Sequence, residues 1–221
     1  MRAPKYREGN GNASKMQTYN EESRVASIMA QVRQADLHDH NMLIYSDLPT
    51  FRKIYSKCAK QALDNNEIVI LITNYDPFDK VIAALKQVGI SVNNETKEGN
   101  LAILDSLKTY QIDVNGSVNF TKSLVTRAAR DGKAGIINLA DLGSFFLSER
   151  VPLLVEYEQS LQRKMAVPAK GICAYHKDDF ASLSKEQQEE IIAAHNCVMQ
   201  PLIDCLITLQ ELSQGNISFK Q

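Results

Sequence analysis

Short apolar runs recur along the chain, separated by longer stretches of mixed or polar composition. The run at residues 67–73 is almost continuous and rich in β-branched side chains, which is typical of a strand covered on both faces of a parallel sheet. The other runs are similarly short and apolar. We therefore expect strands at residues 42–45, 67–73, 101–105, 135–140 and 171–175.

Between these runs, apolar residues return every three or four positions, which predicts amphipathic helices. The helices are expected at residues 21–37, 51–62, 78–88, 120–131 and 147–164, with Gly89 closing the third. Residues 90–92 are expected to be extended, and residues 106–118 to form an irregular connection. The alternation predicts an α/β fold of three layers, a mostly parallel sheet flanked by helices.

The last part of the chain carries a heptad-like pattern. Ser184, with Gln187 three residues later, predicts a helix start with a capping box. Alternating spacings of four and three residues would then place seven side chains on one face of the helix: Ile191, His195, Val198, Leu202, Cys205, Leu209 and Leu212. Pro201 is expected to kink or divide this helix. The stripe either packs on the domain's own sheet or contacts a protein partner or a second copy through Ile191, Val198, Leu202 and Leu209.

Composition divides the chain and limits its class. We expect a disordered tail at residues 1–16, an amphipathic helix at 17–37, the main domain at 38–198 and a helical extension at 199–221. The 25 Lys and Arg residues balance 26 Asp and Glu residues, so charge gives no indication of nucleic-acid binding. No apolar run approaches the roughly 20 residues of a membrane span, and no signal-peptide core is present. Four cysteines without C-x-x-C spacing fit a cytoplasmic protein with reduced thiols.

The loop after the first strand lies where a nucleotide-binding α/β protein carries its phosphate loop. That loop needs glycines for close backbone approach, a Lys for charge and a hydroxyl for magnesium. Aligning Ser46 with the first glycine places Phe51 at the second, Arg52 at the Lys and Lys53 at the hydroxyl position. Phe51 blocks close approach and Lys53 cannot ligate a cation, so we expect no working triphosphate site.

Polar and aromatic side chains follow the carboxyl ends of the predicted strands, where open parallel sheets bind ligands. We expect the ligand-binding residues to be Tyr45, Ser46, Asp47, Asn74, Tyr75, Asp76, Asp141 and Tyr175. Such a rim suits a small organic molecule with one or two hydrogen-bonding groups. Two alternatives remain open: Asp47 and Asp76 as helix caps, and Tyr45 and Tyr175 as core rings.

We expect no metal, no cofactor and no catalytic residue. His38 and His40 point the same way on an extended chain, but no third ligand stands nearby in sequence. Cys173 lies within a strand and fits inert packing better than a nucleophile. Asp105, Asp141 and His176 are the residues that an enzymatic alternative would use.

The order of several short motifs resembles a known family. The motifs are His40-Asn-Met-Leu-Ile-Tyr, the strand at 68–73, Gly99-Asn-Leu-Ala-Ile-Leu-Asp, Leu154-Val-Glu-Tyr-Glu and Ile172-Cys-Ala-Tyr with Phe180. They resemble the MEDS domain, the methanogen/methylotroph DcmR-type sensory domain, over roughly residues 38–198. The resemblance implies a fold related to RecA/KaiC-like ATPases without a functional phosphate loop. It also implies sensing of small molecules such as hydrocarbon derivatives.

The leading hypothesis is a non-catalytic sensory domain that relays ligand occupancy through its terminal helices. MEDS domains are often fused to DNA-binding or kinase modules, whereas no such pattern fits the terminal segments here. We therefore expect signalling through a separate partner. The alternatives are a KaiC-like nucleotide-binding protein or ATPase with an atypical phosphate site, and an interaction module that oligomerises through the heptad-like stripe.

Overall fold

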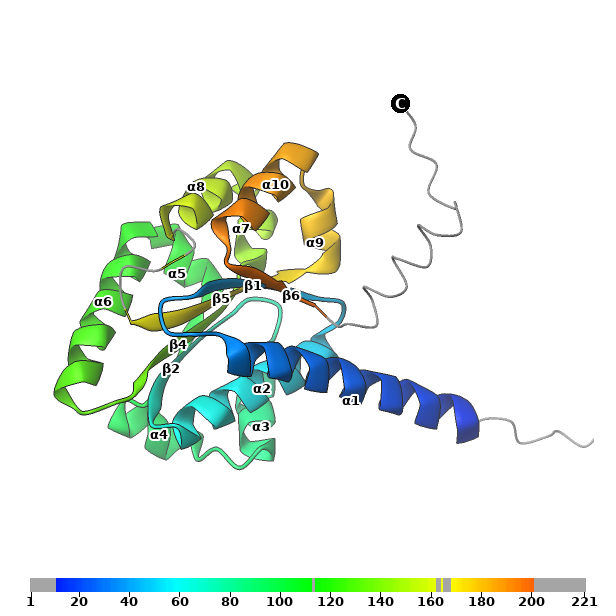
Figure 1. Cartoon of the computed structure of the whole chain (residues 1–221), viewed down its shortest axis with the longest axis horizontal. Coiled ribbons are helices and arrows are strands. Elements are labelled where there is room, and N and C mark those ends of the chain that lie inside the picture. Colours follow the sequence, from blue (N-terminus) through cyan, green and yellow to red (C-terminus); the bar gives the residue numbers. More distant parts are fainter. Residues whose placement is uncertain (1–10, 113, 162–163, 165–167, 201–221) are drawn as a thin grey trace, which may run out of the picture.

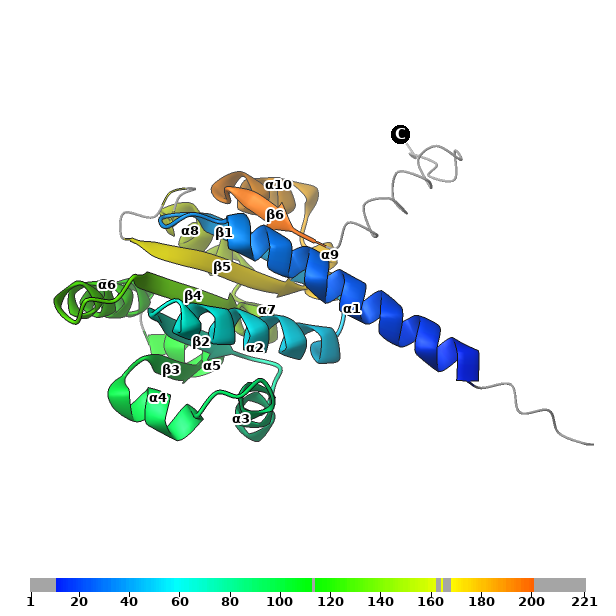
Figure 2. The same ribbon diagram turned by 60° about the horizontal axis from the view of Figure 1, so that its bottom comes forward.

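A single parallel sheet organises the computed structural model, which describes residues 11–112, 114–161, 164 and 168–200. Within these residues the strand order is β3-β2-β4-β5-β1-β6, visible from bottom to top in Figure 2. The strands are β1 (His40–Tyr45), β2 (Glu67–Thr73), β3 (Leu101–Asp105), β4 (Gly135–Asp141), β5 (Ala169–His176) and β6 (Cys197–Met199). All five strand pairings are parallel, which confirms the predicted fold class.

Helices cover both faces of the sheet and complete three layers (Figure 1). On one face lie α1 (Gly11–Gln34), α2 (Leu48–Asp64), α3 (Phe78–Gln87) and α4 (Val92–Glu98). On the other face lie α5 (Ser106–Ile112), α6 (Val114–Arg130), α7 (Gly143–Leu147), α8 (Val151–Leu161), α9 (Lys177–Ser182) and α10 (Lys185–Ala194). Side chains of β2 alternate between the two cores: Val69 and Leu71 face α1–α4, and Ile70 and Ile72 face α5–α10. This double burial explains why residues 68–72 are all apolar.

Two polar segments form helices that the sequence did not predict. Residues 106–118 were expected to be irregular, but α5 and the start of α6 occupy the described part of this stretch. Residues 90–92 were expected to be extended, but α4 begins at Val92 and ends at Gly99 with a left-handed φ of 74°. The only buried residue of α4 is Val92, so this helix lacks the apolar periodicity that identifies a helix in a sequence. The helix expected at 147–164 corresponds to α8, which begins only at Val151, because Leu147 is the last residue of the separate helix α7.

The predicted heptad helix is wrong beyond Ala194. The capping box of Ser184 and Gln187 is present, but His195 ends α10 with extended backbone angles. Val198 then lies in β6, which pairs with β1. Ile191 is fully buried in the domain's own core. Within the described part of the stripe, the apolar residues therefore fill the fold itself, because the spacing runs across a helix end; Leu202 and Leu209 lie outside the described residues.

Helix α1, the first element of the domain, packs beside its last strand, β6. It begins at Gly11, so it includes residues 11–16, which were assigned to the tail. Its buried side chains Val25, Ile28 and Val32 pack against α2 and β6. Gln31 Nε2 also donates a hydrogen bond to the carbonyl oxygen of Gln200 at 2.9 Å. Among the described helices, none is both long and apolar enough to cross a membrane.

Candidate functional site

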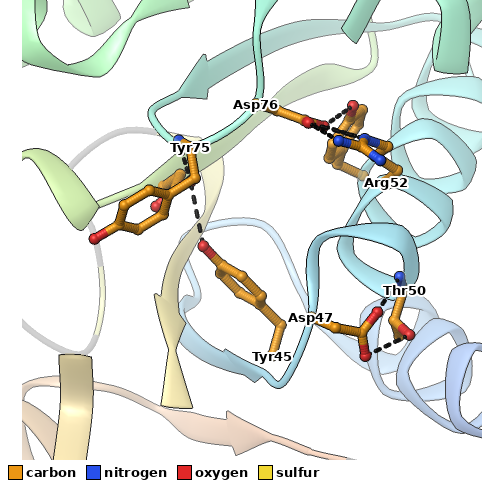
Figure 3. A network of polar contacts seen from close by, with 8 residues as sticks. Tyr45, Asp47, Thr50, Arg52, Tyr75 and Asp76 are labelled. Atoms are coloured by element: carbon orange, nitrogen blue, oxygen red, sulfur yellow. Dashed lines mark hydrogen bonds and ion pairs between the residues drawn. The ribbon is translucent and has the colours of Figure 1, made fainter. Parts of the chain in front are cut away.

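The turn after β1 is held by a helix cap. Asp47 begins α2, and its carboxylate accepts hydrogen bonds from Thr50 N at 2.7 Å and from Thr50 Oγ1 at 3.0 Å (Figure 3). Ser46 Oγ donates to the same carboxylate at 3.0 Å. Pro49 lies in the first turn, where a missing N–H costs nothing. The cap alternative for Asp47 is therefore confirmed, and Ser46 supports it.

Asp141, at the end of β4, is the centre of the rim. It is fully buried. Its carboxylate accepts hydrogen bonds from Tyr45 Oη at 3.3 Å, from Tyr75 N at 3.3 Å and from Gly143 N at 3.0 Å. Burial raises the pKa of Asp141 to about 6, although the N–H groups of Gly143, Tyr75 and Asn74 counteract this. The structure thus brings Tyr45, Asn74, Tyr75 and Asp141 together as predicted.

Asp76 belongs to a second polar group beside the first. Arg52 Nε donates to its carboxylate at 2.8 Å (Figure 3), and Tyr55 Oη also donates to it, at 2.8 Å. Helix α3 begins after Pro77 without a side-chain cap, so the cap alternative for Asp76 is wrong. The buried carboxylate instead ties the loop after β2 to α2.

The last three of the four residues aligned with a phosphate loop all contact protein groups. Phe51 is fully buried, and its ring stacks on Tyr45 with centroids 4.1 Å apart. Arg52 is paired with Asp76, and Lys53 Nζ lies 2.9 Å from Glu21 Oε1 of α1. Phe51, Arg52 and Lys53 therefore belong to the packed start of α2.

Tyr75 and Asn74 lie close against α7. A Cβ atom at Gly143 would stand 2.3 Å from the Tyr75 ring and 2.5 Å from Asn74 Nδ2, so only glycine allows this approach. Tyr75 Oη donates to Asp179 at 2.8 Å, and its ring meets that of the partly exposed His176. Asn74 Nδ2 is buried and has no hydrogen-bond partner among the described residues. A buried donor of this kind is costly unless a group beyond the described residues accepts from it.

Two residues from the predicted strand ends lie apart from this group. Tyr175 is fully buried on the opposite face of the sheet, and its hydroxyl donates to Glu158. Asp105 is exposed and accepts from Lys108 N at 2.8 Å, so it caps α5. The core-ring alternative for Tyr175 therefore describes its position.

An open groove of about 410 Å³ lies beside the rim, between α1, α2 and α3. Its lining includes the cationic side chains of Arg52, Lys53, Lys57 and Lys80. None of the eight predicted ligand residues lines it. Two of its four cations, Arg52 and Lys53, are already paired with Asp76 and Glu21.

Sequence reasoning missed a second cluster, on the α5–α10 face. His40 of β1, Glu158 of α8, Cys173 of β5 and His195 at the end of α10 lie there, all buried. One ligand atom from each lies within 4.8 Å of all the others. Burial, followed by the nearby Glu158 carboxylate, raises the pKa of the Cys173 thiol. We name these four residues the His–Glu–Cys–His cluster; its members could hold a metal ion, and they are too far apart in sequence for the pattern around His38 and His40 to indicate them.

The fold and the rim define a class: a parallel α/β domain with polar side chains at the carboxyl ends of its strands. The family model for MEDS, the MEthanogen/methylotroph, DcmR Sensory domain, matches residues 39–196. The chain belongs to this family of sensory domains, and the resemblance found in the sequence is confirmed.

Two further comparisons concern individual proteins. A crystal structure of a KaiC-like protein from the hyperthermophilic archaeon Pyrococcus horikoshii OT3 is similar, with 16% sequence identity and a TM-score of 0.48. The match covers 71% of this chain and 68% of that chain. None of the curated proteins matches this sequence.

The raised pKa of Asp141 predicts a pH dependence. Its ordinary pKa is 3.8, so the folded protein holds this proton more tightly than the unfolded chain. The contribution of Asp141 to stability therefore falls as the pH rises from about 4 to about 6. We expect Asp141→Asn to cost about 1 kcal/mol more at about pH 5 than at about pH 7.5, measured by urea denaturation. An equal cost at both pH values, or an NMR titration of this carboxyl near its ordinary pKa, contradicts the prediction.

Proposed function

We propose that the protein is a non-catalytic sensory domain that binds a small organic molecule at the rim and relays its presence through α2 and α1. Membership of a sensory-domain family supports the general role. The observation that carries the site is the buried Asn74 Nδ2, a hydrogen-bond donor without a partner among the described residues. A ligand that accepts this hydrogen bond would remove the cost of burying it.

The surroundings of Asn74 indicate the kind of ligand. Tyr75 presents a partly exposed side chain with a hydroxyl, and the imidazole of His176 lies at the edges of both the Tyr45 and Tyr75 rings. Phe78 and Leu147, which follow the rim in sequence, are 57% and 64% exposed. This mixture suits a small, mainly apolar molecule with one carbonyl or hydroxyl oxygen.

The start of α2 argues against a nucleotide. Phe51 fills the position that must be bare backbone, and Arg52 and Lys53 are neutralised by Asp76 and Glu21. A triphosphate would need free cationic groups and backbone N–H groups at this turn. The contacts support a degenerate phosphate loop.

A relay follows from the same contacts. The Asp76–Arg52 pair connects the loop that carries Asn74 to α2, and Lys53 of α2 contacts Glu21 of α1. Helix α1 in turn packs on β6 and reaches Gln200. A ligand that prefers one position of the 74–76 loop would thereby favour one arrangement of α1.

Protein-observed NMR with a panel of short-chain alcohols, aldehydes and ketones tests the proposal. We expect a compound that shifts the signals of Asn74 and Tyr75, and at least about tenfold weaker binding to Asn74→Ala. Because Asn74 Nδ2 makes no hydrogen bond in the described protein, this variant should fold normally. Asn94→Ala, at an exposed position of α4, serves as the matched control.

Four outcomes oppose the proposal. If Asn74→Ala binds as tightly as the unmodified protein, the ligand does not bind at Asn74. If no compound of the panel shifts any signal, the proposed class of ligand is wrong. Magnesium-dependent ATP binding by calorimetry favours the KaiC-like nucleotide-binding alternative, and ATP turnover overturns the non-catalytic role.

A further inference from the structure

We propose that the His–Glu–Cys–His cluster binds one Zn²⁺ ion. The cluster lies on the face of the sheet opposite to α1–α4, and its side chains are at most 3% exposed. It shares no residue with the ligand rim around Asn74 and Asp141, so the inference does not depend on the proposed sensory function.

The spacing of the four ligand atoms fits tetrahedral zinc. His40 Nε2 lies 3.1 Å from Glu158 Oε2 and 3.3 Å from Cys173 Sγ. His195 Nε2 lies 3.4 Å from Glu158 Oε2. Bonds of about 2.0–2.3 Å at tetrahedral angles place ligand atoms about 3.3–3.8 Å apart. The longest separation in the cluster is no more than 4.8 Å, so a small inward movement completes the geometry.

Both imidazoles are oriented as metal ligands usually are. His40 Nδ1 lies 3.1 Å from the carbonyl oxygen of Ala194, and His195 Nδ1 lies 2.7 Å from that of Ile191. When each Nδ1 donates to its carbonyl, both Nε2 atoms turn their lone pairs towards Glu158. A ring N–H bonded to a backbone carbonyl is the common outer shell of a metal-bound histidine.

The carboxylate of Glu158 is also oriented as a metal ligand. Tyr175 Oη donates to its Oε1, which fixes the carboxylate and leaves Oε2 directed at the two imidazoles. Glu158 Oε2 and His195 Nε2 are buried and make no hydrogen bond among the described residues, although they lie 3.4 Å apart. A divalent cation between these atoms would satisfy both at once and also accept the Cys173 sulfur.

The donor set selects the metal. Two imidazoles, one thiolate and one carboxylate match the ligands of zinc, and a fully buried four-ligand site is typical of structural rather than catalytic zinc. Binding converts the Cys173 thiol to a thiolate and releases its proton to solvent. The ion would fasten α8 and the end of α10 to β1 and β5, immediately before β6.

Metal analysis of the full chain tests the proposal. We expect purified protein, stripped with a chelator and then dialysed against ZnCl₂, to retain one Zn²⁺ per chain. Its melting temperature should rise by about 5 °C or more with the metal. Cys173→Ala and His195→Ala should lose both effects. Cys58→Ala, a buried cysteine outside the cluster, and His38→Ala, an exposed histidine near His40, should keep them.

Co²⁺ provides a readout that does not require the variants to fold. Bound to the unmodified chain, it should give the intense visible bands of tetrahedral cobalt and a sulfur-to-metal charge-transfer band. No uptake of Zn²⁺ or Co²⁺ and no change in melting temperature would overturn the proposal. So would uptake without the charge-transfer band, or uptake that survives both Cys173→Ala and His195→Ala.

Discussion

Replacing Phe51 by alanine is expected to lower the free energy of unfolding by about 3–5 kcal/mol. The ring is fully buried, stacks on Tyr45 and meets the edge of Tyr55 at a centroid distance of 5.3 Å. Truncation removes these contacts and leaves a cavity at the start of α2, which the capped turn cannot readily close. Urea denaturation with a fitted m-value measures the loss.

Two variants control this experiment. Phe51→Leu keeps most of the volume and should lose only about 1–2 kcal/mol. Phe78→Ala removes a ring that is 57% exposed and should change stability by no more than about 0.5 kcal/mol. A loss below about 1 kcal/mol for Phe51→Ala would show that the ring does not fill the core. We also expect no gain of ATP binding, because Arg52 and Lys53 keep their acidic partners.

Replacing Arg52 by alanine should cost about 2–3 kcal/mol, because it leaves the carboxylate of Asp76 buried without a counter-charge. The Asp76 side chain is 1% exposed, and only the hydroxyl of Tyr55 among its described donors would remain. The Arg52 side chain is 31% exposed, so water screens part of the interaction and the lower end of the usual range applies. Denaturation by urea at low and moderate salt gives the value.

A neighbouring ion pair supplies the control. Lys53 and Glu21 are more exposed, so Lys53→Ala should cost less than about 1 kcal/mol. The double variant Arg52→Ala with Asp76→Ala should be more stable than the sum of the single losses predicts. If the two losses simply add, the side chains do not interact and the proposed link from the 74–76 loop to α2 is lost.

The sequence located β1, β2, β4 and β5 well because these strands are almost wholly buried. The runs at 67–73 and 101–105 coincide with β2 and β3, and the other three predictions fall one or two residues short of β1, β4 and β5 at one or both ends. Burial on both faces leaves a continuous apolar run that no amphipathic helix shares. β6 was missed because Val198 continues the helical spacing of α10, and only His195 and Asn196 separate the helix from the strand.

The sequence predicts those site residues that follow the ends of strands. It does not predict which side chains from different elements contact one another. Parallel strands bring their carboxyl ends to one edge, so Tyr45, Asn74, Tyr75 and Asp141 could be grouped from sequence. That Asp76 would meet Arg52 depends on how α2 and the 74–76 loop pack, and spacing does not encode this. The His–Glu–Cys–His cluster takes its residues from four separated elements, and no local motif links them.

The position of β1 has a consequence for how the chain folds. Its neighbours in the sheet are β5 and β6: His40 lies opposite Gly171, and Asn41 lies opposite Cys197. Strands β2, β3 and β4 can pair with one another as soon as each is synthesised, whereas β1 leaves the ribosome first and has no neighbour until nearly the whole domain has followed. Such distant pairing slows folding and exposes apolar surface during the wait. The nascent chain should therefore depend on chaperones that hold its first strand apart.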